Sequence, residues 1–137
     1  MNTNDLNKIL ADHKVWLDSS GEKGSFAKLH FADLRDADLR DADLRGADLR
    51  DARLPDHTFV IMGETYYLQI TNGEYVKAGC QNHTAEKWRN FSKREIAEMD
   101  GKKAIKFYPR LLKIIDFYLG KGQHPDWVKD LSGEDAE

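Results

Sequence analysis

The sequence has little of what several protein classes require. Cys80 is the single cysteine among 137 residues, so no intrachain disulfide can form. No apolar run approaches the ~20 residues needed to cross a bilayer, and the mean hydropathy is −0.70. Basic residues are not in excess, because 21 Lys and Arg stand against 24 Asp and Glu, a formal net charge of −3. We therefore expect neither membrane insertion nor direct binding of a nucleic acid.

Targeting signals and catalytic motifs are also missing. The first residues, MNTNDLNKIL, lack a basic region followed by an apolar stretch, and a lone cysteine suits a reducing compartment, so we expect a cytoplasmic protein. The sequence contains no phosphate loop, dinucleotide fingerprint or zinc-protease helix. We expect no cofactor and no enzymatic activity.

One short spacing invites a metal hypothesis. Cys80 and His83 stand in C-x₂-H order, with His57 as a conceivable third ligand. No second clustered pair accompanies them, and such a spacing arises easily by chance. The alternative is a small buried thiol beside a helix-capping imidazole, and we expect no metal site.

One segment repeats with a period of five. Residues 31–54 read FADLRDADLRDADLRGADLRDARL, and with residues 27–29 the leucines define six units. A helix would rotate leucines five apart by about 140° each time, and a strand would alternate them between faces, so neither forms an apolar stripe. The pattern predicts a backbone that turns every five residues and presents the same two positions inward each time.

The units resemble the pentapeptide-repeat family, whose motif is A(D/N)LXX, over residues 27–54, about a fifth of the chain. The resemblance implies a short right-handed quadrilateral β-helix with four pentapeptides per coil, hence about 1.5 coils here. Residues twenty apart then stack, which places Lys28 over Asp48 and Asp33 over Arg53. A coil this short exposes backbone at both ends, which the rest of the chain must cap.

The charge of the repeat bears on function. In some members of that family the rod resembles duplex DNA and binds DNA gyrase or protects it from quinolones. Residues 32–56 hold eight aspartates against five arginines, a weak imitation of a polyanion, and the alternative is that these charges are only solvated positions of a short solenoid. The expected partner-binding residues are seven aspartates of the repeat: Asp33, Asp36, Asp38, Asp41, Asp43, Asp48 and Asp51.

The flanking sequence predicts an α+β fold. Apolar residues recur at helical spacing over residues 4–18, with Asn4 as the expected N-cap. This helix and the turn after it make up residues 1–24. We expect the helix to cover the open end of the first coil of the repeat, residues 25–56. Three β-rich stretches, 58–62, 65–71 and 74–79, follow, and Asn72-Gly73 predicts a type I′ hairpin turn between the last two.

Helices follow the hairpin and complete the 57–120 segment. Thr84 begins a short helix, Ser92 opens a capping box, and Gly101 ends that second helix. The last helix spans about 102–119, with Pro109 either in its first turn or at a kink. Residues 121–137 are expected to be a partly disordered polar tail apart from a contact by Trp127, and 1–137 to be a single compact unit.

Two stretches suggest a biological context. YYLQITNGEYVKAGCQNHTAEKW and IAEMDGKKAIKFY resemble a module that follows short pentapeptide runs in phage and prophage proteins. We expect a non-enzymatic interaction protein, phage or prophage encoded, that inhibits a host DNA-handling or antiviral complex in the bacterial cytoplasm by occupying its nucleic-acid-binding surface. Candidate targets are a CRISPR effector, a restriction enzyme and DNA gyrase. The alternative is a scaffold that forms homodimers or larger assemblies without inhibiting anything.

Overall fold

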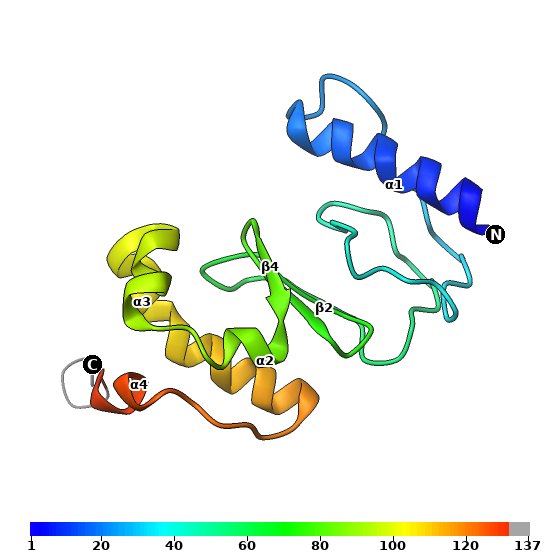
Figure 1. Ribbon diagram of the computed structural model, residues 1–137. Coiled ribbons are helices and arrows are strands. Elements are labelled where there is room, and N and C mark those ends of the chain that lie inside the picture. The colour runs from blue at the N-terminus through cyan, green and yellow to red at the C-terminus, as the bar shows by residue number, and fades with distance from the viewer. Residues whose placement is uncertain (132–137) are drawn as a thin grey trace. The chain divides into compact units, whose positions relative to one another are not determined.

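A computed structural model describes residues 1–131 of the chain (Figure 1). Its elements are α1 (Thr3–Asp18), β1 (Phe59–Ile61), β2 (Leu68–Thr71), β3 (Tyr75–Ala78), β4 (Gln81–Thr84), α2 (Ala85–Trp88), α3 (Lys93–Leu119) and α4 (Asp126–Leu131). The strands form one antiparallel sheet in the order β1-β2-β3-β4. The predicted mixture of an N-terminal helix, a sheet and C-terminal helices is confirmed.

The contacts gather into two compact units. The first comprises Met1–Met62 with Gln69–Gly73, and the second comprises Gly63–Leu68 with the chain from Glu74 onwards. The sequence predicts that residues 1–137 form a single compact unit that unfolds cooperatively. This stays a prediction.

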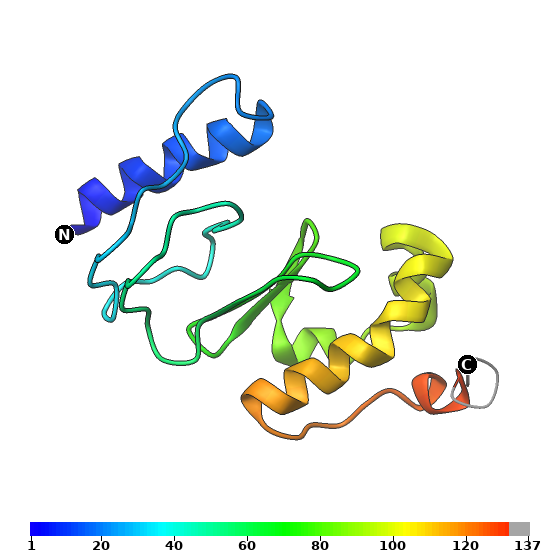
Figure 2. The same cartoon turned by 180° about the vertical axis from the view of Figure 1, so that it is seen from behind.

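Helix α1 begins two residues earlier than the predicted cap. The side chain of Asn2, not Asn4, accepts a hydrogen bond from the Asp5 N–H at 2.8 Å, and the Asn2 backbone is extended. Its apolar residues Leu6, Ile9 and Leu10 belong to the same core cluster as the repeat leucines. Figures 1 and 2 show α1 alongside the loops of the repeat, which confirms that the N-terminal helix covers this segment.

The repeat turns after every leucine. In each of five turns the alanine N–H donates to the carbonyl of the leucine three residues earlier, at 3.0 to 3.1 Å: Ala32 to Leu29, Ala37 to Leu34, Ala42 to Leu39, Ala47 to Leu44 and Ala52 to Leu49. Each turn carries the next alanine and leucine inward. Leu29, Leu34, Leu39 and Leu44 are at most 2% exposed and form the core of the first unit.

Residues twenty apart pair as the resemblance to the pentapeptide-repeat family implies. Parallel bridges join Lys28 to Asp48 and Asp33 to Arg53. In the first bridge the Leu29 N–H donates to the Asp48 carbonyl at 2.9 Å, and the Asp48 N–H donates to the Ala27 carbonyl at 2.8 Å. The register inferred from the sequence is confirmed at both bridges.

The hairpin is part of a larger sheet than expected. Asn72 and Gly73 both have positive φ, 53° and 69°, as an Asn-Gly turn requires. The sequence prediction missed β4, which pairs with β3 through a tight turn at Gly79 and Cys80 that sets Ala78 opposite Gln81. Its residues, Gln-Asn-His-Thr, have little strand propensity, and the pairing with β3 overrides it.

The helices begin and end largely where their capping residues predict. Thr84 caps α2, and Ser92 and Glu95 form both hydrogen bonds of a capping box at the start of α3. The backbone leaves helical geometry at Asp100 and Gly101, the predicted break. Pro109 lies inside α3, so the helix does not begin there.

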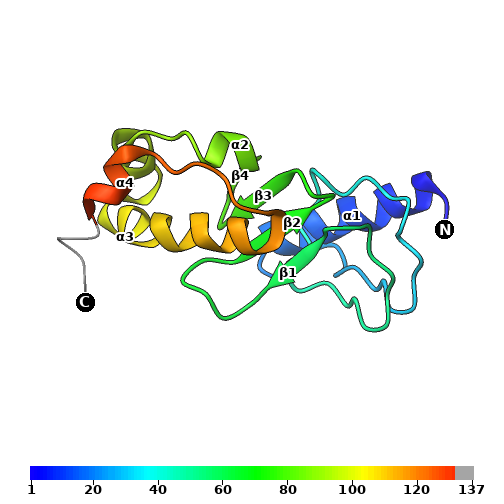
Figure 3. The ribbon, with the colours of Figure 1, turned by 90° about the horizontal axis from the view of Figure 1, so that it is seen from below.

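The predicted polar tail contains a helix. In α4, Val128 and Leu131 are 7% and 6% exposed, and Figure 3 shows α4 beside α3. Trp127 donates from its indole N–H to the Phe91 carbonyl at 2.9 Å and stacks on Tyr108, which confirms its contact. Burial of these apolar residues orders this part of the tail, so the disorder prediction is wrong for 126–131; residues 132–137 lie outside the described range.

Candidate interaction surface of the repeat

The outward-facing charges of the repeat fall into two sets. In the first set, each aspartate that precedes a leucine binds the arginine that follows the same leucine. Arg35 donates from Nε to Asp33 Oδ1 at 2.9 Å and from Nη2 to Asp33 Oδ2 at 2.7 Å. The guanidinium and carboxylate therefore meet as a bidentate fork, the strongest geometry for this pair of groups.

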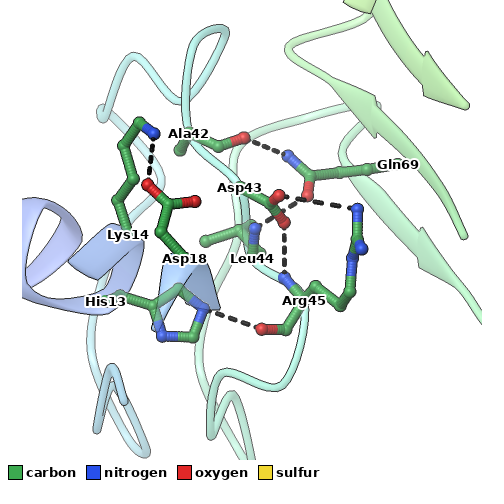
Figure 4. A network of polar contacts seen from close by, with 8 residues as sticks. All are labelled: His13, Lys14, Asp18, Ala42, Asp43, Leu44, Arg45 and Gln69. Carbon is green, nitrogen blue, oxygen red and sulfur yellow. Dashed lines mark hydrogen bonds and ion pairs between the residues drawn. The ribbon is translucent and has the colours of Figure 1, made fainter. Parts of the chain in front are cut away.

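The fork recurs along the repeat. Asp38 and Arg40 form it at 2.8 and 2.7 Å, and Asp48 and Arg50 form it at 2.9 Å in both bonds. Asp43 and Arg45 are looser, with 3.6 Å between Oδ2 and Nη2; Figure 4 shows this pair. We call these four pairs the Asp–Arg forks: Asp33–Arg35, Asp38–Arg40, Asp43–Arg45 and Asp48–Arg50.

Each aspartate of a fork pairs with an arginine two residues later, not with a charged side chain twenty residues away. Although the backbone of Lys28 pairs with that of Asp48, the Lys28 ammonium lies over the Phe26 ring, 5.6 Å from its centroid. The Asp48 carboxylate is held by Arg50 and lies 3.5 Å from His30. An arginine two residues away reaches along the same edge of the chain, which explains why this pairing prevails.

The forks shift the titration of their acids. Hydrogen bonds from the Arg40 and Arg50 side chains lower the pKa values of Asp38 and Asp48 from 3.8 to about 2. The Arg35 guanidinium lowers the pKa of Asp33 further still. These carboxylates are therefore ionised and already paired at neutral pH, which reduces their capacity to bind a partner's cation.

Removing one fork should restore ordinary titration. Arg40→Gln is expected to raise the pKa of Asp38 from about 2 toward 3.8, measured by NMR through the carboxyl carbon shift. Because the folded pKa is lowered, the fork's contribution to stability is present above pH 3.8 and is lost as the pH falls through about 2. Arg53→Gln is the control, and an Asp38 pKa unchanged in Arg40→Gln would contradict the fork.

The second set consists of exposed aspartates at the last position of a unit. They are Asp36, Asp41 and Asp51. Within residues 1–131, their carboxylates form no hydrogen bond and no close ion pair. We call these three residues the corner aspartates. With Asp56, which is also exposed at the last position of its unit, they are the carboxylates of the repeat that lie outside the Asp–Arg forks.

Phe31 occupies the same repeat position as the corner aspartates. It is 74% exposed and its φ is +62°, a left-handed conformation that is strained for a bulky side chain. Its N–H donates to the Arg50 carbonyl at 2.9 Å, which holds the turn, and its ring lies edge-on to the His30 ring. The sequence prediction missed Phe31, although an aromatic residue at a position otherwise held by Asp or Gly was a visible signal.

A histidine from α1 binds two backbone groups of the repeat segment. His13 is fully buried, its Nδ1 accepts from the Ala27 N–H at 3.0 Å, and its Nε2 lies 2.7 Å from the Arg45 carbonyl oxygen (Figure 4). Because Ala27 can only donate, Nδ1 is the acceptor and the proton resides on Nε2. The neutral ring thus satisfies two backbone groups of the coil at once.

Side-chain amides from β2 and the turn after it form hydrogen bonds with backbone groups of the repeat. Gln69 accepts from the Leu44 N–H at 2.9 Å and donates to the Ala42 carbonyl at 2.8 Å (Figure 4). Asn72 does the same for the Leu39 N–H and the Ala37 carbonyl, at 3.1 and 3.0 Å.

The Asp48 backbone forms the same two hydrogen bonds, since its carbonyl accepts from the Leu29 N–H and its N–H donates to the Ala27 carbonyl. After residue 54 the chain leaves the repeat, and the Leu39 and Leu44 N–H groups bind side chains in place of the backbone of a later unit. A side-chain amide carries the same carbonyl and N–H as a peptide group, which is why Gln and Asn can take its place.

The metal hypothesis finds no support in the side-chain arrangement. The Cys80 thiol is exposed rather than buried, and His83 Nε2 lies 2.9 Å from Gln81 Oε1 while its ring packs against Trp88 and Phe91. Burial lowers the pKa of His83. The cap of α2 is Thr84, so His83 is not a capping imidazole. Among residues 1–131, no three His, Cys, Asp or Glu side chains gather to hold a metal ion.

None of the helices found between residues 1 and 131 has the length and apolar character that a membrane span requires.

Comparison with known proteins agrees with the geometry of the repeat. Residues 25–56 match the family model described as Pentapeptide repeats (8 copies). This similarity covers the turns and bridges described above, and it indicates a protein-interaction module. No curated protein and no solved structure matches the chain. Nothing in these comparisons supports the expected likeness of residues 66–108 to a phage module.

Proposed function

We propose that the protein is a non-enzymatic protein-interaction module that binds its partner through the corner aspartates and Phe31. In this proposal residues 25–56 form a short right-handed quadrilateral β-helix. The turns at every leucine and the two bridges between residues twenty apart support that shape. The coil is a rigid scaffold, because α1 and two side-chain amides bind the backbone of Ala27, Leu44 and Leu39, and a rigid scaffold loses little entropy on binding.

One observation carries the proposal: the carboxylates of the repeat divide into paired and unpaired sets. Binding through the forks would require a partner to displace a bidentate guanidinium from Asp33, Asp38 and Asp48. The corner aspartates need no such exchange. Of the seven aspartates predicted to bind a partner, the proposal therefore keeps Asp36, Asp41 and Asp51 as the direct contacts and gives Asp33, Asp38, Asp43 and Asp48 a positioning role.

The partner that best complements this surface is a protein with a cationic, nucleic-acid-binding face. Exposed carboxylates steer association with such a face, and the lack of a net positive charge argues against direct binding of nucleic acid. In its most specific form, the proposal is an inhibitor, encoded by a phage or prophage, that occupies the nucleic-acid site of a host DNA-handling or antiviral complex.

Two triple variants with equal charge change test the proposal. The immobilised protein is exposed to bacterial lysate, and the recovered proteins are identified before and after elution with duplex DNA. Asp36/Asp41/Asp51→Asn is expected to lower recovery of a nucleic-acid-binding partner about tenfold, at roughly 0.5 kcal/mol for each exposed charge. Asp33/Asp38/Asp48→Asn, the matched control, is expected to lower it less than threefold.

Each outcome of this experiment has a defined meaning. Equal losses in the two triple variants would show that net charge, and not the corner aspartates, governs binding. Recovery of no nucleic-acid-binding protein, or recovery that duplex DNA does not reverse, would refute the inhibitory function.

Phe31 gives a prediction that separates binding from stability. Phe31→Asn is expected to raise the free energy of unfolding by about 0.5–1 kcal/mol, because Asn adopts positive φ more readily than Phe, while it weakens partner recovery. Urea denaturation measures the first effect. Phe26→Asn is the control and should lower stability, since Phe26 packs against Trp16 at 5.8 Å between ring centroids. A destabilised Phe31→Asn would assign Phe31 a structural role.

A second candidate, a homodimeric scaffold, is favoured by one specific feature. Within the described residues, the N–H groups of Leu49 and Leu54 and the carbonyls of Ala47 and Ala52 form no hydrogen bond. They mark an open edge of the second coil, where an identical chain could pair in an isologous dimer. Sedimentation equilibrium at micromolar concentration distinguishes the candidates: a monomer excludes a constitutive scaffold.

A further inference from the structure

The second unit contains a cavity that the interaction surface of the repeat does not involve. Its volume is about 300 Å³, and all the side chains that line it belong to this unit. The walls come from the β3–β4 turn, from Trp88 of α2, and from α3 on both sides of its break. Ligand-binding cavities begin at about this size.

The break in α3 explains why the cavity exists. Asp100 has φ −160° and ψ 34°, and Gly101 has φ +60° and ψ −143°, so the helix changes direction between Met99 and Ala104. Side chains before and after the break therefore form two different walls. Small residues at Ala78, Gly79 and Ala104 leave space between these walls and the turn.

The lining is apolar with one charged group. Trp88, Phe107 and Tyr108 supply aromatic surface and are 3%, 6% and 1% exposed. Among the lining residues the one carboxylate is that of Asp100, which accepts a hydrogen bond from the Tyr66 hydroxyl at 2.5 Å. Burial and the neighbouring Asp100 raise the pKa of Tyr66 to about 12, so its hydroxyl stays protonated and the carboxylate stays the acceptor.

The rim accommodates a cation. The Lys103 ammonium already lies 5.0 Å from the centroid of the Tyr66 ring, within the range of a cation–π contact. A carboxylate and the face of a tyrosine at the mouth of an apolar cavity attract a positive charge. The Lys103 ammonium is the positive charge that this rim already holds.

We propose that this cavity binds a small aromatic amine, with its ring against the aromatic wall and its ammonium at Asp100. A 150 Å³ apolar cavity holds benzene, so about twice that volume holds a ring with a short aliphatic arm. The site lies in the second unit and has no part in the partner binding proposed for the repeat.

Three probes that share a phenyl ring and differ in charge test the proposal: 2-phenylethylamine, neutral 2-phenylethanol and anionic 3-phenylpropionate. Binding to the full chain is measured by calorimetry and by amide chemical shifts. The amine is expected to bind at least tenfold more tightly than the alcohol, and the carboxylate least tightly. Asp100→Asn retains an acceptor for Tyr66, and it should reduce the difference between amine and alcohol to less than twofold.

Filling the cavity provides the second arm of the experiment. Ala104→Leu adds volume inside the cavity at a helical position and should weaken binding of the amine at least tenfold. Ala97→Leu, on the same helix but outside the lining, is the matched control and should leave binding unchanged. No saturable binding of the amine, or binding that Ala104→Leu does not weaken, would overturn the site. A preference for the amine that persists in Asp100→Asn would overturn the role of Asp100.

Discussion

Replacement of Gln69 by Met is expected to lower the free energy of unfolding by about 3 kcal/mol. Gln69 is 1% exposed, and its amide is the partner of the Leu44 N–H and the Ala42 carbonyl. Met has a similar length and fills the same space, so packing changes little. Two backbone groups of the coil lose their hydrogen bonds, and each buried group left unpaired costs about 1–3 kcal/mol.

Urea denaturation of the wild type and the variant measures this effect as a change in midpoint at constant slope. Gln123→Met is the matched control, because Gln123 is exposed, and its effect should remain within about 0.5 kcal/mol. A loss below 1 kcal/mol in Gln69→Met would show that the amide does not stabilise the repeat.

His13→Leu is expected to cost about 2–3 kcal/mol, the second largest effect. The ring is fully buried and serves the Ala27 N–H and the Arg45 carbonyl, which leucine cannot. His13→Asn should be intermediate, since its Oδ1 can take the place of Nδ1 as acceptor for Ala27 but cannot reach Arg45. The amide of Ala27 should also exchange with solvent faster in the leucine variant.

The same denaturation experiment, with His30→Leu as control, checks this prediction. The His30 side chain is 46% exposed and its replacement should change stability little. Equal stability of the His13 variants and the wild type would contradict the stabilising role of the ring. The two predictions together test whether the short coil depends on side chains from outside the repeat.

The sequence predicted those features that depend on residues close together along the chain. A leucine every fifth residue requires a turn every fifth residue, and four turns per coil set Lys28 beside Asp48. The capping box at Ser92 and the break at Gly101 were equally predictable, because a cap involves side chains within one helical turn and glycine alone adopts the required dihedrals readily.

The candidate site was only partly predictable. The abundance of aspartate in the repeat was plain, but sequence gave no reason to separate Asp38 from Asp41. Their difference arises because the Arg40 side chain folds back along its own unit to Asp38. Phe31 was overlooked because its strain is a property of the backbone dihedral, and β4 was overlooked because its pairing partner, not its composition, makes it a strand.

The period of five by itself determined where the repeat turns and which residues face its core, and the resemblance to the pentapeptide-repeat family implied which residues pair. Only the tertiary structure decided how the open coil is satisfied, since Gln69 and Asn72 meet backbone groups 25 to 35 residues away. It also decided which carboxylates remain unpaired. A local pattern specifies the conformation of its own segment, whereas an unpaired N–H, carbonyl or charge acquires its partner only when distant segments meet.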